Sequence, residues 1–168
     1  MKRVFLILGI LVLSAGTAMA QNYMVVDSEK VFKSIAAYNS ALTEVDADAQ
    51  RYQQQIDEAF NQLETTFNSY QQRKAGMSVA ERAAEEQRIV ARENEIKKFQ
   101  SDQFGEEGTI MKKRISLIKP IQDRVFAAIE KYAAERGYDI VLDLASNPTI
   151  LYHKPAVNHT DAIIAIVK

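Results

Sequence analysis

Apolar residues recur at helical spacing over residues 28–136, and this pattern restricts the possible folds more than any other feature of the chain. In the first half they follow one another at steps of three and four, which is typical of a coiled-coil seam. These positions are Leu42, Val45, Ala49, Tyr52, Ile56, Phe60, Leu63, Phe67 and Tyr70. The second half carries Ile89, Ile96, Phe99, Ile110, Ile118, Ile121, Val125, Ile129 and Tyr132 near one face. The sequence therefore predicts two long amphipathic helices, each on the order of 70 Å, rather than a compact enzyme.

A short break at residues 73–78 separates the two helices. Gly76 is expected to end the first helix in the left-handed conformation. Ser78 followed by Glu81 has the spacing of a capping box that starts the second helix. Because so short a connection returns the chain antiparallel, residues 28–137 are predicted to form a helical hairpin, with its tip at 73–78.

Three residues disturb the second helix. Gly105 and Gly108 interrupt the apolar stripe, and glycine inside a helix costs about 1 kcal/mol relative to alanine. They mark either a flexible zone or a merely imperfect helix. Pro120 lacks a backbone donor, so a kink or a restart is expected where the arm enters the rest of the protein.

The ends of the chain read as β-structure. Residues 23–27 form a short apolar run that predicts a strand, with Ser28 as the cap of the following helix. Residues 138–143 and 149–152 predict two more strands, and residues 161–167 a short terminal helix. The fold class is therefore α+β, with a small β-rich body built from residues 21–27 and 138–168. So small a body with open strand edges is expected to oligomerise, and a three-fold ring is one solution.

Residues 1–20 have the composition of a secretory signal peptide. A basic start, an apolar run from Val4 to Leu13 and a small-residue ending predict cleavage between Ala20 and Gln21. The alternative is an uncleaved anchor, but the apolar run is well short of the ~20 residues that span a bilayer. Export across the inner membrane would place the mature chain in the periplasm.

Charge and cysteine content exclude several classes of protein. The whole chain has 21 basic and 22 acidic residues, and removal of Lys2 and Arg3 with the leader gives a net charge of −3. That balance argues against nucleic acid as a partner. The chain has no cysteine and hence no disulfide framework. No Gly-rich phosphate-binding loop is present, and no cofactor is expected.

The chain resembles the Skp (OmpH-like) family of periplasmic chaperones over its whole mature length. The likeness lies in the leader, the strand 23–27 running into 28–32, the hairpin, the stretch 137–143, and the segments 150–152 and 160–164. The resemblance implies a jellyfish-shaped homotrimer whose arms hold unfolded outer-membrane proteins without ATP. Well-known members are strongly basic, whereas this mature chain is mildly acidic, so lipopolysaccharide binding and strong electrostatic capture stay open and membrane-surface contact is expected to be weak.

Two sets of residues are candidates for binding such clients. The aromatic set either joins the two arms or faces outward as an apolar lining; it comprises Phe60, Phe67, Tyr70, Phe99 and Phe104. The basic set is either a solvated face or a holder of acidic clients or lipid; it comprises Lys112, Lys113, Arg114 and Lys119.

Other polar residues are better explained by local structure. His153 and His159, with Asp143, lack the spacing of a metal site and are interpreted as turn residues. Asp27, Asp139 and Asp143 are interpreted as turn and cap formers, since no nucleophile accompanies them. Asn158-His159-Thr160 matches a glycosylation sequon but serves equally as a helix cap. The function classes are therefore a passive holdase chaperone, then a coiled-coil spacer or adaptor of the cell envelope, with an enzyme a distant third.

Overall fold

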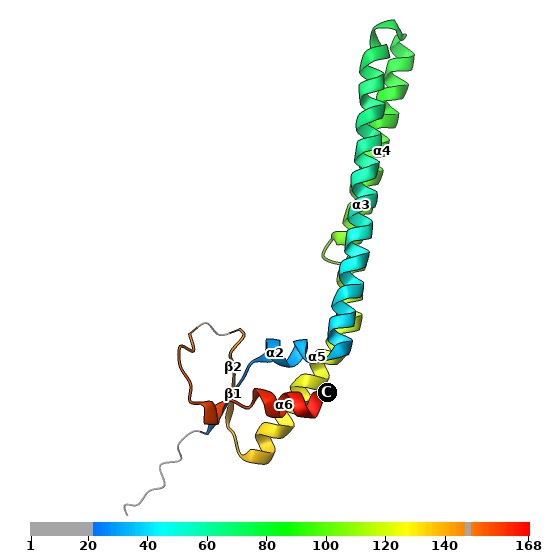
Figure 1. The fold of residues 1–168 in the computed structure, drawn as a ribbon. Coiled ribbons are helices and arrows are strands. Elements are labelled where there is room, and N and C mark those ends of the chain that lie inside the picture. The colour runs from blue at the N-terminus through cyan, green and yellow to red at the C-terminus, as the bar shows by residue number, and fades with distance from the viewer. Residues whose placement is uncertain (1–21, 147–148) are drawn as a thin grey trace, which may run out of the picture.

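The computed structural model describes residues 22–146 and 149–168, which form a long helical hairpin standing on a small body (Figure 1). In chain order the elements are β1 (Tyr23–Val26), α2 (Ser28–Lys33), α3 (Ala36–Arg73), a 3-10 turn (Lys74–Gly76), α4 (Val79–Phe104), α5 (Thr109–Arg136), β2 (Ile140–Asp143), a second 3-10 turn (Pro155–Val157) and α6 (Thr160–Val167). None of the helices in the described residues is long and apolar enough to cross a membrane.

The first arm is α3, and it is shorter than the sequence predicts. Its 38 residues extend about 57 Å. The helix starts at Ala36 and not at residue 28, because Ser34 and Ile35 interrupt the helical path between α2 and α3. The Ser34 hydroxyl donates to the Val31 carbonyl at 2.7 Å, and the Asn39 amide donates to the Lys33 carbonyl at 2.8 Å. Ile35 itself is extended and buried in the body. The six residues of α2 therefore belong to the body and not to the arm.

The tip confirms the capping box and corrects the role of Gly76. Ser78 accepts from the Glu81 backbone N–H at 3.3 Å, and the Glu81 carboxylate accepts from the Ser78 N–H at 2.8 Å. Gly76 lies in a 3-10 turn with a negative φ, so the prediction of a left-handed residue there is wrong. The left-handed glycine is Gly137, at φ 70°, which ends α5 with the Tyr138 N–H bonded to the Ala133 carbonyl at 3.0 Å.

The second arm is interrupted between α4 and α5, and Figure 1 shows this loop standing out from the hairpin. Gly108 is buried there, and a Cβ on it would lie 2.7 Å from the Gln103 carbonyl oxygen. The glycines thus end one helix and admit a tight loop before the next, which is more than an imperfect helix. Pro120 lies inside an uninterrupted α5, so no restart occurs, and the arm curves where α5 enters the body.

The body is a two-stranded parallel sheet packed against α2, α6 and the lower part of α5. Tyr23 pairs with Ile140 and Val26 with Asp143, and Val25 within β1 also forms an isolated parallel bridge with Asn158. The predicted strand at residues 149–152 is wrong, since these residues form no strand and pair with none within the described part of the chain. The core consists of Met24, Val26, Val31, Phe32, Ile35, Val125, Tyr132, Ala133, Ile163 and Val167.

Polar side chains join the body's segments. Asp27, not Ser28, caps α2 by accepting from the Lys30 N–H at 3.0 Å. The Asp143 carboxylate accepts from the Ser28 N–H at 3.0 Å and the Ser28 hydroxyl at 2.8 Å. Burial acts to raise the pKa of Asp143, but its hydrogen bonds with Ser146 and Ser28 outweigh this and hold the pKa below its ordinary value. Asp143 therefore locks β2 to the start of α2.

Candidate functional site

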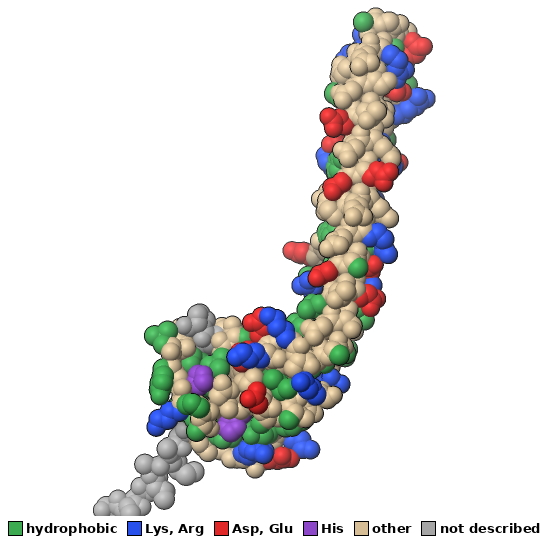
Figure 2. All heavy atoms as spheres, viewed as in Figure 1, with side chains coloured by type: hydrophobic (Ala, Val, Ile, Leu, Met, Phe, Trp, Pro, Cys, Tyr) green, Lys and Arg blue, Asp and Glu red, His purple; other side chains and the backbone are tan. Residues whose placement is uncertain are grey.

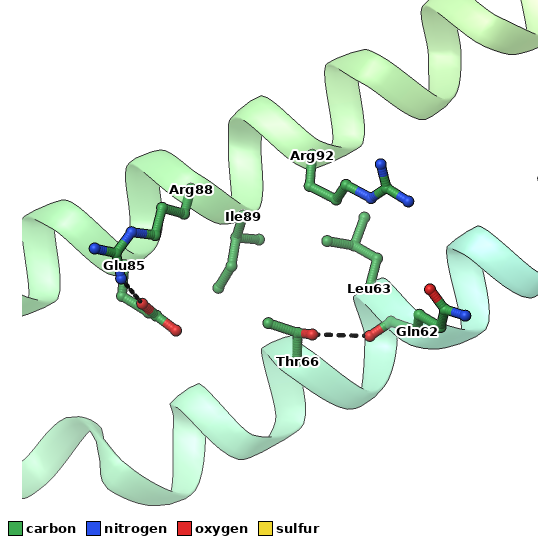
Figure 3. Close-up of a pocket in the computed structure, with 7 residues that line it drawn as sticks. All are labelled: Gln62, Leu63, Thr66, Glu85, Arg88, Ile89 and Arg92. Atoms are coloured by element: carbon green, nitrogen blue, oxygen red, sulfur yellow. Dashed lines mark hydrogen bonds and ion pairs between the residues drawn. The ribbon is translucent and has the colours of Figure 1, made fainter.

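The middle of the hairpin carries two grooves that share a floor. Leu63 on α3 and Ile89 on α4 meet along the seam and contribute to both. The first groove, shown in Figure 3, holds polar and basic side chains; its lining is Gln62, Leu63, Thr66, Glu85, Arg88, Ile89 and Arg92. Arg88 and Arg73 both pair with Glu85, at 3.1 and 3.6 Å. We call it the arginine groove.

The second groove, here called the apolar groove, takes its walls from other residues. Its lining is Phe60, Asn61, Leu63, Glu64, Phe67, Ile89, Val90 and Glu93, around a volume of about 510 Å³. Phe67 and Val90 are 44% and 54% exposed. Since Phe67 and Thr66 lie to either side of the inward-facing Leu63 on a helix, the two grooves lie on opposite sides of the seam. The apolar groove leaves large apolar side chains in contact with solvent.

The aromatic set divides into exposed and buried members. Phe60 is half-buried in the apolar groove, Phe67 is exposed in it, and Phe104 is 39% exposed at the end of α4. Phe99 is half-buried and packs edge-on against Tyr52 across the arms, with ring centroids 6.0 Å apart. Aromatic pairing and outward exposure are therefore both present, as the spacing allowed.

Tyr70 does not belong to the exposed set. Its side chain is 1% exposed, and its hydroxyl donates a short hydrogen bond to the Glu86 carboxylate on α4. This bond raises the pKa of Tyr70 and lowers the pKa of Glu86. Tyr70 sits on the inward seam next to the tip, where the arms are in contact, so it joins the arms and cannot line a surface without opening them.

The basic set is not a free cationic patch. The Lys113 ammonium reaches across the arms to Asp48 and to Glu44, the latter at 2.8 Å. The hydrogen bond from Lys113 lowers the pKa of Asp48, and the same bond raises the pKa of Lys113. Lys119 pairs with Asp123 at 2.8 Å, one turn along α5. Lys112 and Arg114 are exposed, which leaves two of the four cations outside these ion pairs.

Apolar exposure at the base of the arms was missed in the sequence. Met111, Ile115 and Phe126 on α5 are 44%, 52% and 55% exposed. A third groove lies beside Ile115; its lining is Tyr38, Leu42, Arg114, Ile115, Ile118, Lys119 and Gln122. The spacing of Met111 and Ile115, four residues apart and off the seam, was the available signal. Figure 2 shows charges of both signs scattered along the visible face of the arm.

The body carries its own exposed apolar residues. Leu151 and Tyr152 are 92% and 79% exposed in the segment between β2 and α6, and Tyr23 and Ile140 are 46% and 41% exposed on the sheet. Among the described residues no third strand pairs with β2, so its outer edge is open. An open edge beside exposed apolar side chains is typical of a surface that is covered in an assembly.

His159 has a structural role that the turn interpretation missed. Its two ring nitrogens lie 2.9 Å from the hydroxyls of Tyr132 and Tyr138, which ties the start of α6 to α5 and to the short connection between α5 and β2. His153 is hydrogen-bonded to the Lys154 carbonyl at 3.2 Å. The cleavage position predicted between Ala20 and Gln21 lies outside the described residues.

Comparisons with known protein families and solved structures both find OmpH-like proteins. The model of a family described as outer membrane protein (OmpH-like) matches residues 22–167. A crystal structure named as a candidate outer membrane chaperone (OmpH-like) from Caulobacter crescentus superposes with a TM-score of 0.67. The superposition covers 88% of this chain and 84% of the Caulobacter crescentus chain at 11% sequence identity. At this identity the likeness shows the fold alone. Comparison with curated protein sequences gives no match.

Proposed function

Since the chain belongs to the OmpH-like family, we propose that it is an ATP-independent holdase chaperone of the periplasm, which binds unfolded outer-membrane proteins between helical arms and prevents their aggregation. The name of the Caulobacter crescentus protein, a candidate outer membrane chaperone, supports this assignment. We assign the chain no catalytic role and no cofactor.

The observation that carries the proposal is the apolar groove on an arm that stands away from the body. Phe67 and Val90 expose apolar surface to solvent at mid-arm, where the structure of one chain needs none. Burying such surface is favourable, non-directional and roughly proportional to area, which suits many weak contacts with varied unfolded chains. Release then needs no nucleotide, because a client that folds buries its own apolar residues.

We further propose that the working form is a homotrimer assembled through the body. The support is the open edge of β2 together with the exposed Leu151 and Tyr152. Three chains would place three hairpins around one cavity, so that their grooves act on one client together. Light scattering coupled to gel filtration should give a mass near three mature chains, and a monomer at micromolar concentration would contradict this arrangement.

The second candidate is a coiled-coil spacer or adaptor of the cell envelope. A spacer gains rigidity from a continuous seam, whereas here the loop between α4 and α5 interrupts the second arm. Exposed Phe67 and Phe104 likewise serve no purpose in a spacer without a client. These two features favour the chaperone.

The deciding experiment dilutes a urea-denatured β-barrel membrane protein into buffer with the mature chain, without ATP, and follows turbidity. At a stoichiometric ratio of assembled chaperone to client, we expect the client to stay soluble. A spacer would leave the client aggregating as it does in buffer alone. Cell fractionation that recovers the chain outside the periplasm would contradict the localisation.

A further inference from the structure

We propose that the apolar groove selects extended segments in which an aromatic or aliphatic residue stands beside a lysine or arginine. The inference rests on the proposed function, because it names which parts of an unfolded client the arm binds. It follows from the way charge is distributed between the two sides of the hairpin.

The apolar half of the preference comes from the groove's floor and walls. Phe60 and Phe67 on α3 and Val90 on α4 surround the shared floor of Leu63 and Ile89. The volume of about 510 Å³ is open to solvent along the arm, so an extended chain can lay a large side chain into it without the arms separating. Removal of this apolar surface from water drives the contact.

The basic half of the preference comes from two carboxylates. Glu64 on α3 and Glu93 on α4 line the groove from opposite arms, and no Lys or Arg is among the lining residues. Glu93 pairs with Lys97 at 2.5 Å, whereas no ion pair within the described residues engages Glu64. A cation beside the buried side chain of a client therefore meets the carboxylate of Glu64, which no ion pair within the described residues engages.

The opposite side of the seam has the reverse character. The arginine groove carries Arg88, which pairs with Glu85 at 3.1 Å (Figure 3). It also carries Arg92, which pairs with Glu95 at 3.0 Å. Its lining places polar and charged side chains beside Leu63 and Ile89, and its cations already have partners. Of these two grooves, the apolar groove alone combines exposed large apolar side chains with a carboxylate outside the described ion pairs, and that combination favours an apolar residue next to a basic one.

The test measures binding of the mature protein to three fluorescently labelled, unstructured peptides by anisotropy. They share one apolar core sequence, flanked by Lys, Gln or Glu. In low salt we expect the Lys-flanked peptide to bind about three- to tenfold more tightly than the Gln-flanked one, and the Glu-flanked peptide more weakly, as for a few solvent-exposed charge pairs. The differences should shrink at about 1 M salt, where the Debye length is about 3 Å.

Two matched variants locate the effect. The double substitution Glu64→Gln with Glu93→Gln should abolish the ranking, so that the three peptides bind with similar affinity. Glu58→Gln with Glu95→Gln makes the same change in charge on the same part of the hairpin, outside the lining of this groove, and should preserve the ranking. Phe67→Ala should weaken all three peptides alike.

Equal binding of the three peptides, or a ranking that survives loss of Glu64 and Glu93, would overturn the inference while leaving the holdase proposal intact. Failure of every peptide to bind, with a β-barrel client still kept soluble, would show that another surface holds clients and would also overturn it. If the β-barrel client aggregates as well, the proposed function itself fails.

Discussion

Replacing Ile163 by alanine should destabilise the body by about 3 kcal/mol. Ile163 is 0% exposed in α6 and lies in the core with Val125 and Tyr132. The change removes three carbon atoms, which at about 0.8 kcal/mol each accounts for about 2.4 kcal/mol of lost burial. The cavity left behind adds to this, and measured values for such substitutions run from about 2 to 5 kcal/mol.

Urea unfolding followed by circular dichroism measures the effect. With a slope of about 2 kcal/mol per M, a loss of 3 kcal/mol lowers the midpoint by about 1.5 M. Ile166→Ala is the matched control, because Ile166 lies in the same helix and is 55% exposed. At equal protein concentration its midpoint should move by much less. If the two variants shift the midpoint equally, α6 does not dock through Ile163 and the core described above is wrong.

Three further predictions concern pH, the arms and the clients. As pH falls through 3.8, the ordinary pKa of aspartate, the body should lose stability, because the folded pKa of Asp143 lies lower; Asp143→Asn should flatten this acid limb in urea titrations. Removing residues 50–74 together with 78–102 should leave the number of chains per oligomer, measured by light scattering, unchanged and should abolish holdase activity. A monomeric product would mean that the arms drive assembly. Client affinity should change less than about tenfold between low and high salt, or about 1.4 kcal/mol, and Phe60→Ala with Phe67→Ala should weaken it more than neutralising Lys112, Lys113 and Arg114; a steep salt dependence would contradict this.

The hairpin could be predicted from the sequence because its signal is local. Steps of three and four identified a seam whose members turn inward, apart from the exposed Phe67. The capping box could be predicted equally well, since Ser78 and Glu81 lie three residues apart in the sequence. The break at Ser34 could not be predicted, because Ile35 continues the helical spacing although its side chain packs in the core of the body.

The errors in the body arise from contacts that pair distant residues. Residues 149–152 have the composition of a strand, but a strand also requires a partner, and β1 takes β2 and Asn158 as neighbours. Tyr70 looked equivalent to Phe67 by spacing, yet Glu86 on the facing helix binds its hydroxyl. Lys113 likewise reads as one of three adjacent cations until the loop at Gly108 places it opposite Asp48. Sequence spacing alone does not give the register between the arms.

The parallel pairing of β1 with β2 has a consequence for the order of folding. Tyr23 meets Ile140 across 117 residues of chain, which is a costly loop to close in an unfolded protein. If the hairpin forms first, the effective loop shortens to on the order of ten residues. The entropic cost of closing it is then about 2 kcal/mol smaller. Hairpin formation is local and should therefore precede the sheet. Matched insertions or deletions in the two arms should then leave the rate of β1–β2 pairing unchanged. Arm length can therefore vary among such proteins without slowing the folding of the body.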